Sequence, residues 1–218
     1  MSSPDASPPP VLAARNLTVS RGGRQLFADV SFALSAGSLL ILKGPNGAGK
    51  TSLLLALAGA IRLESGEIAY RDEESASATH LLPVQNAVKP RLTVAENLGF
   101  WRAVNGPTGG AVDAALARVG LGGLGAIEAG HLSTGQTRRL ALARLLVSRR
   151  PVWLLDEPAT ALDSDGETLV RDMLVDHCSG GGVAVVATHH DLGLTGQGVG
   201  VETLTFEAGA ARLSEVPW

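Results

Sequence analysis

One octapeptide, GPNGAGKT at residues 44–51, limits the folds open to this chain more than any other stretch. It separates an apolar run at residues 38–43 from a second apolar run that begins at Ser52. The first run predicts a strand buried on both faces of a parallel sheet, and the second predicts a buried helix without a polar face. The octapeptide matches the pattern G-x-x-x-x-G-K-[ST] between a strand and a helix, and this context predicts a phosphate-binding loop.

The residue types of this loop suit a nucleoside triphosphate. Glycines let backbone N–H groups turn inward around a phosphate, and the start of the following helix adds partial positive charge. Lys50 can reach the β and γ phosphates, and the Thr51 hydroxyl can ligate Mg²⁺. A glycine-rich turn with a surface lysine is the alternative, which the complete match disfavours. We expect these residues to bind the nucleotide: Gly44, Pro45, Asn46, Gly47, Ala48, Gly49, Lys50 and Thr51.

A later apolar run, residues 152–155, ends in two adjacent carboxylates. Asp156 follows the predicted strand directly, where a carboxylate can hold Mg²⁺ on a bound triphosphate. Its neighbour Glu157 can polarise an attacking water. The alternative is a solvated turn after a strand, which is common where no phosphate loop accompanies it. Together the two motifs predict a nucleoside triphosphate site.

One helix start adds to this prediction of a nucleotide site. Ser133, Thr134 and Gly135 precede an apolar helix, so that their hydroxyl and free N–H groups could face an anion; an ordinary N-cap is the alternative. A second such start has a purpose if two chains meet face to face. Ser164, with Glu167 three residues later, predicts a capping box that begins another helix.

Patterns elsewhere indicate an α/β core. Alternating apolar residues before residue 42, interrupted at Gly22–Gly23, predict an antiparallel hairpin. Ser65–Gly66 predicts a turn before a short strand. Helical periodicities with glycine-rich breaks from Gln85 to Arg150 predict a helical insert, after which strands and helices alternate.

Composition excludes several classes of protein. A formal net charge of -3 argues against a general basic surface for nucleic acid. The single cysteine, Cys178, excludes an intramolecular disulfide framework.

The most apolar run, Leu53–Ile61, is far shorter than the roughly 20 residues that span a bilayer. Any membrane role would therefore depend on a partner. Residues 1–10 lack the features of a secretory signal and predict a flexible tail.

In this order, the motifs resemble those of the ATP-binding cassette (ABC) ATPases. GPNGAGKT is similar to their Walker A loop, VWLLDE to their Walker B strand, and LSTGQ to their signature, with Thr134 where the family usually has glycine. The resemblance implies a P-loop NTPase core with an antiparallel β subdomain and a helical insert. It also implies that residues 11–218 form one domain, with a helical subdomain at approximately 86–150.

The same resemblance implies further roles. Gln85 matches the Q-loop and would contact Mg²⁺ and water and couple to a membrane partner, while Glu157 would be the general base. His189, rather than its neighbour His190, matches the switch histidine that contacts the γ phosphate. Asp163 matches the D-loop and would cross a dimer interface. The residues expected to cap ATP on a second copy are Ser133, Thr134, Gly135 and Gln136.

One position departs from the family pattern. The family commonly places an aromatic residue before the Gly22–Gly23 turn to stack on adenine, and this chain has Arg21 there. A guanidinium plane can also stack on a base, but a solvated surface arginine is an equally good interpretation. Specificity for adenine is therefore implied by the family and not by this residue.

Segments between the motifs narrow the resemblance. SRGGRQLFADVSF, KPRLTVAENLGFW and Trp153 in PVWLLDEP resemble the ATPase subunits of bacterial haem exporters of cytochrome c maturation. This implies a homodimer using ATP and Mg²⁺ on the cytoplasmic face of the inner membrane, bound to integral membrane subunits of the CcmB and CcmC type. Direct binding of haem or of nucleic acid is not expected.

Three other functions stay open from the sequence. The first is an ATPase subunit of an ABC transporter for another substrate. The second is a soluble cassette ATPase of translation or DNA repair, although such proteins usually carry two cassettes or a long coiled-coil insert. The third is a small-molecule phosphotransferase, which would leave LSTGQ and His189 without a role.

Overall fold

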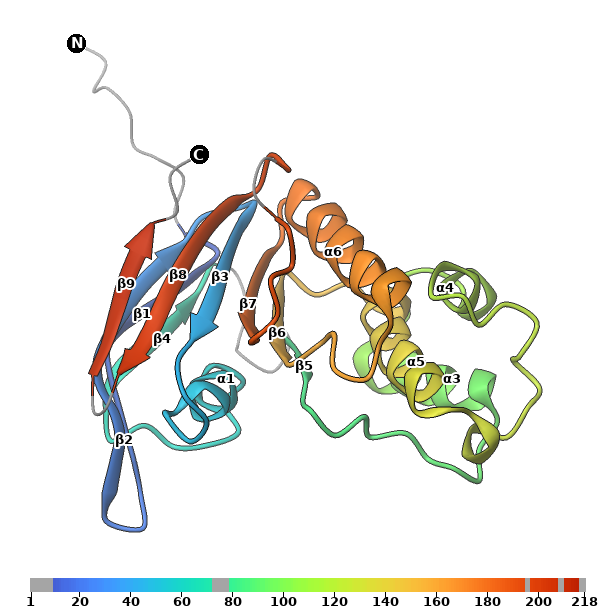
Figure 1. The fold of residues 1–218 in the computed structure, drawn as a ribbon, viewed down its shortest axis with the longest axis horizontal. Coiled ribbons are helices and arrows are strands. Elements are labelled where there is room, and N and C mark those ends of the chain that lie inside the picture. Colours follow the sequence, from blue (N-terminus) through green and yellow to red (C-terminus); the bar gives the residue numbers. More distant parts are fainter. Residues whose placement is uncertain (1–9, 72–78, 195–196, 208–209, 216–218) are drawn as a thin grey trace.

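The chain forms two sheets and a set of helices in a computed structural model, which describes residues 10–71, 79–194, 197–207 and 210–215 (Figure 1). Apart from Pro10, the predicted tail lies outside the described residues. The strands are β1 (Leu12–Arg21), β2 (Arg24–Leu34), β3 (Ser38–Lys43), β4 (Ser65–Tyr70), β5 (Thr79–Leu82), β6 (Val152–Asp156), β7 (Val183–Ala187), β8 (Gly200–Glu207) and β9 (Ala210–Glu215). The helices are α1 (Lys50–Leu57), α3 (Val94–Asn105), α4 (Val112–Arg118), the 3₁₀ helix η1 (Ala129–His131), α5 (Thr134–Val147) and α6 (Ser164–Ser179).

The smaller sheet is antiparallel and has the order β2-β1-β4. The predicted hairpin of β1 and β2 is confirmed, and its turn contains Gly22 and Gly23 with φ angles of 60° and 75°. The predicted turn at Ser65–Gly66 is wrong, because both residues begin β4. Gly66 is needed there for another reason: a Cβ would lie 2.5 Å from the carbonyl oxygens of Arg15 and Asn16.

The larger sheet has the order β5-β6-β7-β3-β8-β9, and all its pairs are parallel except that of β8 with β9. Its central strands are buried on both faces, as the continuous apolar runs predict. Val152 and Leu154 pack with residues of α1, whereas Trp153 and Leu155 pack with residues of α5 and α6. The sheet therefore separates two layers of apolar side chains.

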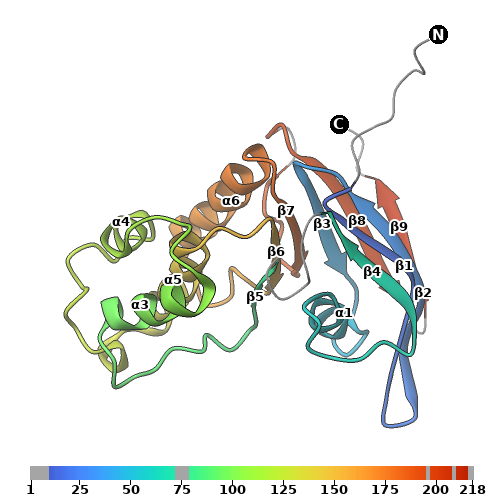
Figure 2. The same ribbon diagram turned by 180° about the vertical axis from the view of Figure 1, so that it is seen from behind.

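The helices between β5 and β6 gather on one side of the molecule. In both ribbon views α3, α4 and α5 lie beyond β5 and β6, away from α1 and the smaller sheet (Figures 1 and 2). Helix α3 begins with a capping box formed by Thr93 and Glu96. The division of the chain at residues 86–150 into a core and a helical subdomain stays a prediction.

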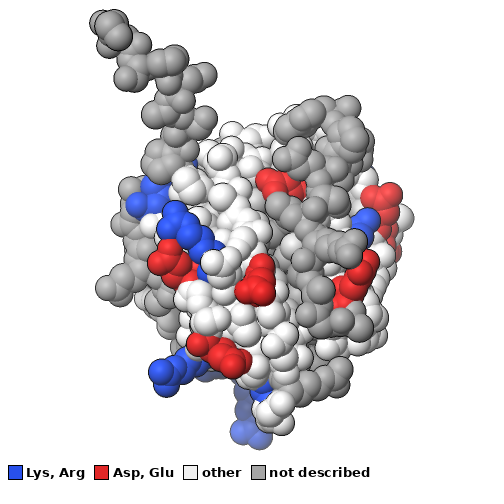
Figure 3. Space-filling model, turned by 90° about the vertical axis from the view of Figure 1, so that its left-hand side faces the viewer, with Lys and Arg blue, Asp and Glu red and all other residues white. Residues whose placement is uncertain are grey.

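Charged side chains are interspersed on the side of the molecule that lies at the left of Figure 1. Among the described residues of that face, acidic and basic groups alternate over short distances (Figure 3). Within the described ranges, every helix is too short or too polar to cross a bilayer.

Candidate functional site

Three loops meet at one edge of the larger sheet. Strands β6, β7 and β3 are neighbours and run parallel, so their carboxyl ends lie side by side. The segments that leave these ends are 44–49, 156–157 and 188–190. In an open parallel sheet, ligands bind outside this edge. The sheet order alone thus brings together residues that lie more than a hundred positions apart in the sequence.

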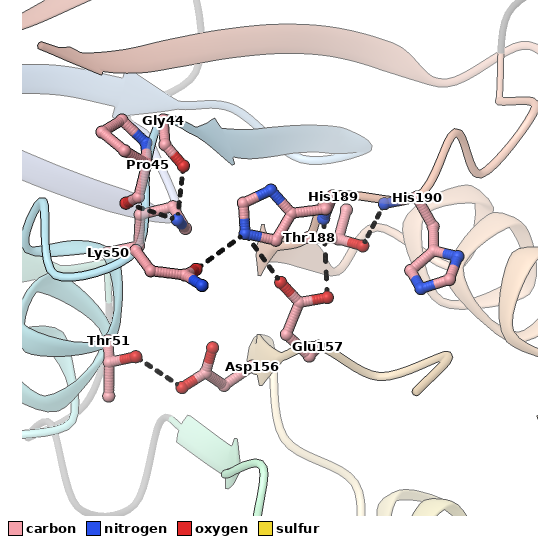
Figure 4. Close-up of polar contacts among 10 residues, drawn as sticks. Gly44, Pro45, Lys50, Thr51, Asp156, Glu157, Thr188, His189 and His190 are labelled. Carbon is pink, nitrogen blue, oxygen red and sulfur yellow. Dashed lines mark hydrogen bonds and ion pairs between the residues drawn. The ribbon is translucent and has the colours of Figure 1, made fainter. Parts of the chain in front are cut away.

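The first loop folds around the side chain of Lys50. Gly49 caps α1 in the left-handed conformation (φ 112°), and Gly44 has a φ of 132°. A Cβ on Gly44 would lie 2.5 Å from the carbonyl oxygen of Phe206, so only glycine fits there. The Lys50 ammonium donates to the carbonyl oxygens of Gly44 at 2.6 Å and Pro45 at 3.1 Å (Figure 4). The charge is therefore held within the loop rather than in solvent.

Thr51 and Asp156 form the second part of the site. The Thr51 hydroxyl donates to Asp156 Oδ2 at 2.7 Å, which joins the first turn of α1 to the end of β6 (Figure 4). Asp156 is buried, with 5% of its surface exposed. A hydroxyl and a carboxylate are the oxygen donors that Mg²⁺ prefers, so this pair fits a magnesium site.

Glu157 lies beside His189. Its backbone has a φ of 47°, in the left-handed region that side chains rarely adopt, and its N–H donates to the carbonyl of Ala187 at 2.8 Å. Its carboxylate lies 3.6 Å from His189 Nε2, and that nitrogen lies 3.1 Å from Asn46 Oδ1 (Figure 4). His189 therefore bridges the loop that holds Lys50 and the carboxylate of Glu157.

His190 faces a different element. Its ring Nδ1 lies 3.3 Å from a carboxylate oxygen of Glu167 in α6, and its backbone N–H donates to the Thr188 hydroxyl. Figure 4 shows the ring pointing away from Glu157. Of the two adjacent histidines, the structure places only His189 against Glu157 and Asn46.

Asp163 is the N-cap of α6, so the predicted capping box at Ser164 is wrong by one residue. The Asp163 carboxylate accepts from the Gly166 N–H at 2.9 Å and from Arg139 Nη2 at 3.1 Å. The hydrogen bond from Gly166 is the main cause that holds the pKa of Asp163 below its usual value, and the contact with Arg139 adds to it. Glu167 contacts His190 instead of closing a box.

The remaining predicted site residues lie elsewhere. Gln85 is exposed on the loop after β5, and among the described residues no hydrogen bond joins it to the cluster around Lys50 and Glu157. Ser133 is the N-cap of α5 and forms a capping box with Gln136. The start of α5, which includes Thr134 and Gly135, lies well apart from α1 in both ribbon views (Figures 1 and 2).

One residue of this region, Arg138, was not predicted from the sequence. It is only 2% exposed and donates to backbone carbonyls on both sides of Glu157. The available signal was its position in α5, on a stripe that it shares with buried Ala141, Leu142 and Leu145 at helical spacing. A charged residue on such a stripe needs buried acceptors.

Comparison with known proteins defines the class. The family model described as "ABC transporter" matches residues 27–160, more than half of the chain. A solved dimeric ATP-binding cassette in a post-hydrolysis state, bound to ADP and Pi, has the same fold, with a TM-score of 0.79, 21% identity, and coverage of 95% of this chain and 99% of that one. The chain belongs to the ABC transporter family. It is therefore an ATP-binding protein that hydrolyses ATP.

Curated relatives narrow the comparison to one branch of this family. The chain is 48% identical over 206 residues to the "Cytochrome c biogenesis ATP-binding export protein CcmA" of Paracoccus denitrificans, covering 94% of this chain and 92% of the relative. It is 47% identical over 190 residues to the protein of the same name from Mesorhizobium japonicum, covering 85% and 94%. The similarity thus extends well beyond the nucleotide motifs.

Proposed function

We propose that this chain is the ATP-hydrolysing subunit of the haem exporter of cytochrome c biogenesis, where it powers haem export or release of the haem-loaded chaperone. The observation that carries the proposal is the identity of 47–48% with proteins named for this system, over most of both chains. The assembly of Lys50, Glu157 and His189 at one sheet edge supports the catalytic part.

Each side chain of the site has a defined task in this proposal. Lys50 exchanges its carbonyl partners for β and γ phosphate oxygens, and His189 contacts the γ phosphate. Glu157 accepts a proton from the attacking water. The residues that would hold Mg²⁺ are Thr51, Asp156 and Gln85, and the ion, when bound, would neutralise charge on the phosphates.

The site requires a second copy of the chain. Because the start of α5 lies apart from α1 in the same chain, it is free to face the nucleotide of another copy (Figures 1 and 2). In the resulting homodimer, Ser133, Thr134, Gly135 and Gln136 of one chain cap the ATP of the other, and Asp163 crosses the interface. Membrane subunits of the CcmB and CcmC type hold this dimer on the cytoplasmic face of the inner membrane.

A complementation experiment tests the physiological role. In a strain that lacks this protein, the wild-type chain should restore c-type cytochromes, measured by haem staining of denatured proteins, and Lys50→Ala should not. Arg15→Ala, which removes only an exposed ion pair with Glu67, serves as the control and should restore them. Normal c-type cytochromes in the deletion strain would point to a transporter for another substrate.

A further inference from the structure

Arg138 is a buried arginine whose hydrogen bonds go almost entirely to backbone carbonyls. It lies in the second turn of α5, five residues after Ser133. All three guanidinium nitrogens donate hydrogen bonds, and the side chain is 2% exposed. Burial lowers the pKa of Arg138, and the nearby carboxylates of Asp156 and Glu157 oppose that shift. The guanidinium lies where two loops converge.

The first of these loops contains Glu157. Arg138 Nη2 donates to the carbonyl of Asp156 at 2.9 Å and to that of Glu157 at 2.7 Å, and Nε donates to Pro158 at 3.0 Å. These bonds fix the peptide groups on both sides of Glu157, whose φ of 47° is costly for a side-chain-bearing residue. The guanidinium thus holds the backbone that aims the Glu157 carboxylate at His189.

The second loop contains Gln85. Arg138 Nη1 donates to the carbonyl of Pro83 at 3.0 Å and to Asn86 Oδ1 at 2.9 Å, with the Val84 carbonyl at 3.4 Å. These acceptors lie on both sides of Gln85, within two residues of it. One planar, rigid cation therefore ties the segment around Gln85 to the segment around Glu157.

We propose that Arg138 is a positioning residue for ATP hydrolysis, which holds Glu157 in place and links that position to the loop of Gln85. The inference rests on the function proposed above, because it assigns the general base to Glu157. A displacement of the Gln85 loop would reach Glu157 through the guanidinium. Arg138 itself touches neither the nucleotide loop nor Thr51 in the hydrogen bonds of the described residues.

Helix α5 offers a matched control. Arg144 is also buried, at 8% exposure, but it stacks on the Trp101 ring, and within the described part of the chain its hydrogen bond goes to the Asn86 carbonyl, at 3.3 Å. Replacement of either arginine by lysine keeps the charge and removes the planar fork. Arg144→Lys therefore reproduces the loss of a buried arginine without releasing the backbone of Glu157.

The test measures kcat and ATP affinity of the purified full-length chain. Arg138→Lys should lower kcat by about ten- to a hundredfold, the range expected when a catalytic group is misplaced by about 1 Å, and should leave the dissociation constant for ATP within about twofold. Arg144→Lys and Arg138→Lys should lower the melting temperature by similar amounts, but Arg144→Lys should keep kcat within about threefold of the wild-type value. A general loss of structure would instead weaken ATP binding and catalysis together.

Asn86→Ala keeps the test decisive if Arg138→Lys does not fold. This milder change removes one acceptor on the loop of Gln85, and it should lower kcat by about two- to fivefold without changing ATP affinity. The inference is overturned if folded Arg138→Lys keeps kcat within twofold of wild type, or if Arg144→Lys loses as much kcat as Arg138→Lys does. If Arg138→Lys does not fold, an unchanged kcat in Asn86→Ala overturns it. Full turnover in Glu157→Gln would instead overturn the underlying assignment of the base.

Discussion

At the scale of single residues, two largely buried histidines lie beside Trp153 of β6: His80 is in the neighbouring strand β5, and His177 is in α6. His177 stacks on Trp153 with ring centroids 4.0 Å apart, and His80 bonds the Ser148 carbonyl at 2.8 Å. Desolvation by burial lowers the pKa of each histidine from 6.5 to about 4. Both rings are therefore neutral in the folded chain at neutral pH.

These two histidines should make the stability depend on pH. Since their folded pKa values lie below the unfolded value, the stability is full above pH 6.5 and declines as the pH falls toward 4. Between pH 7.5 and 5.5, protonation of the pair should lower the unfolding free energy by about 3 kcal/mol. Urea unfolding at a series of pH values measures this. His80→Gln should remove about half of the dependence, and an unchanged dependence would contradict the assignment.

Residue types in the motifs predicted most of the chemistry of the site. Lys50, Thr51, Asp156 and Glu157 were expected from the spacing of two motifs, and the structure brings them to one edge. Arg138 was not expected, because arginines are usually solvated and its partners are backbone carbonyls, which no sequence pattern records. The catalytic roles of Lys50, Thr51, Asp156 and Glu157 stay predictions.

At the scale of elements, apolar runs predicted strands more reliably than capping residues predicted the starts of helices. The runs that became β3 and β6 are largely buried strands in parallel pairs, as their continuous apolar residues predicted. The start of α6 was misplaced because Asp163 and Ser164 are both good capping residues. The path of the preceding loop selects between them, and that path depends on tertiary contacts such as the one between Arg139 and Asp163.

The cap assignment gives a prediction for α6. Asp163→Ala should lower the unfolding free energy by about 1 kcal/mol, because the Gly166 N–H loses its acceptor. Ser164→Ala is the matched control, and it should change the stability by less than about 0.5 kcal/mol, since Ser164 is already within the helix. Chemical denaturation of both variants measures the difference. A larger loss in Ser164→Ala would restore the original capping box.

At the scale of the whole molecule, the fold separates two halves of one proposed site. The loop of Lys50 and the start of α5 lie on different sides of the chain (Figures 1 and 2). The second anion-binding helix start and the family resemblance both suggested a partner chain, but sequence spacing cannot show that two loops in one chain are too far apart to meet. A second copy of the chain supplies the missing half in our account.

Light scattering of Glu157→Gln with and without ATP tests this central claim most directly. Removal of the general base should block turnover and trap the nucleotide, so that the molar mass doubles when ATP is added. Glu157→Gln combined with Ser133→Arg should stay monomeric, because the added side chain occupies the face that caps the partner's ATP. A monomer in both samples, or equal dimerisation of both variants, would contradict a site completed by a second chain.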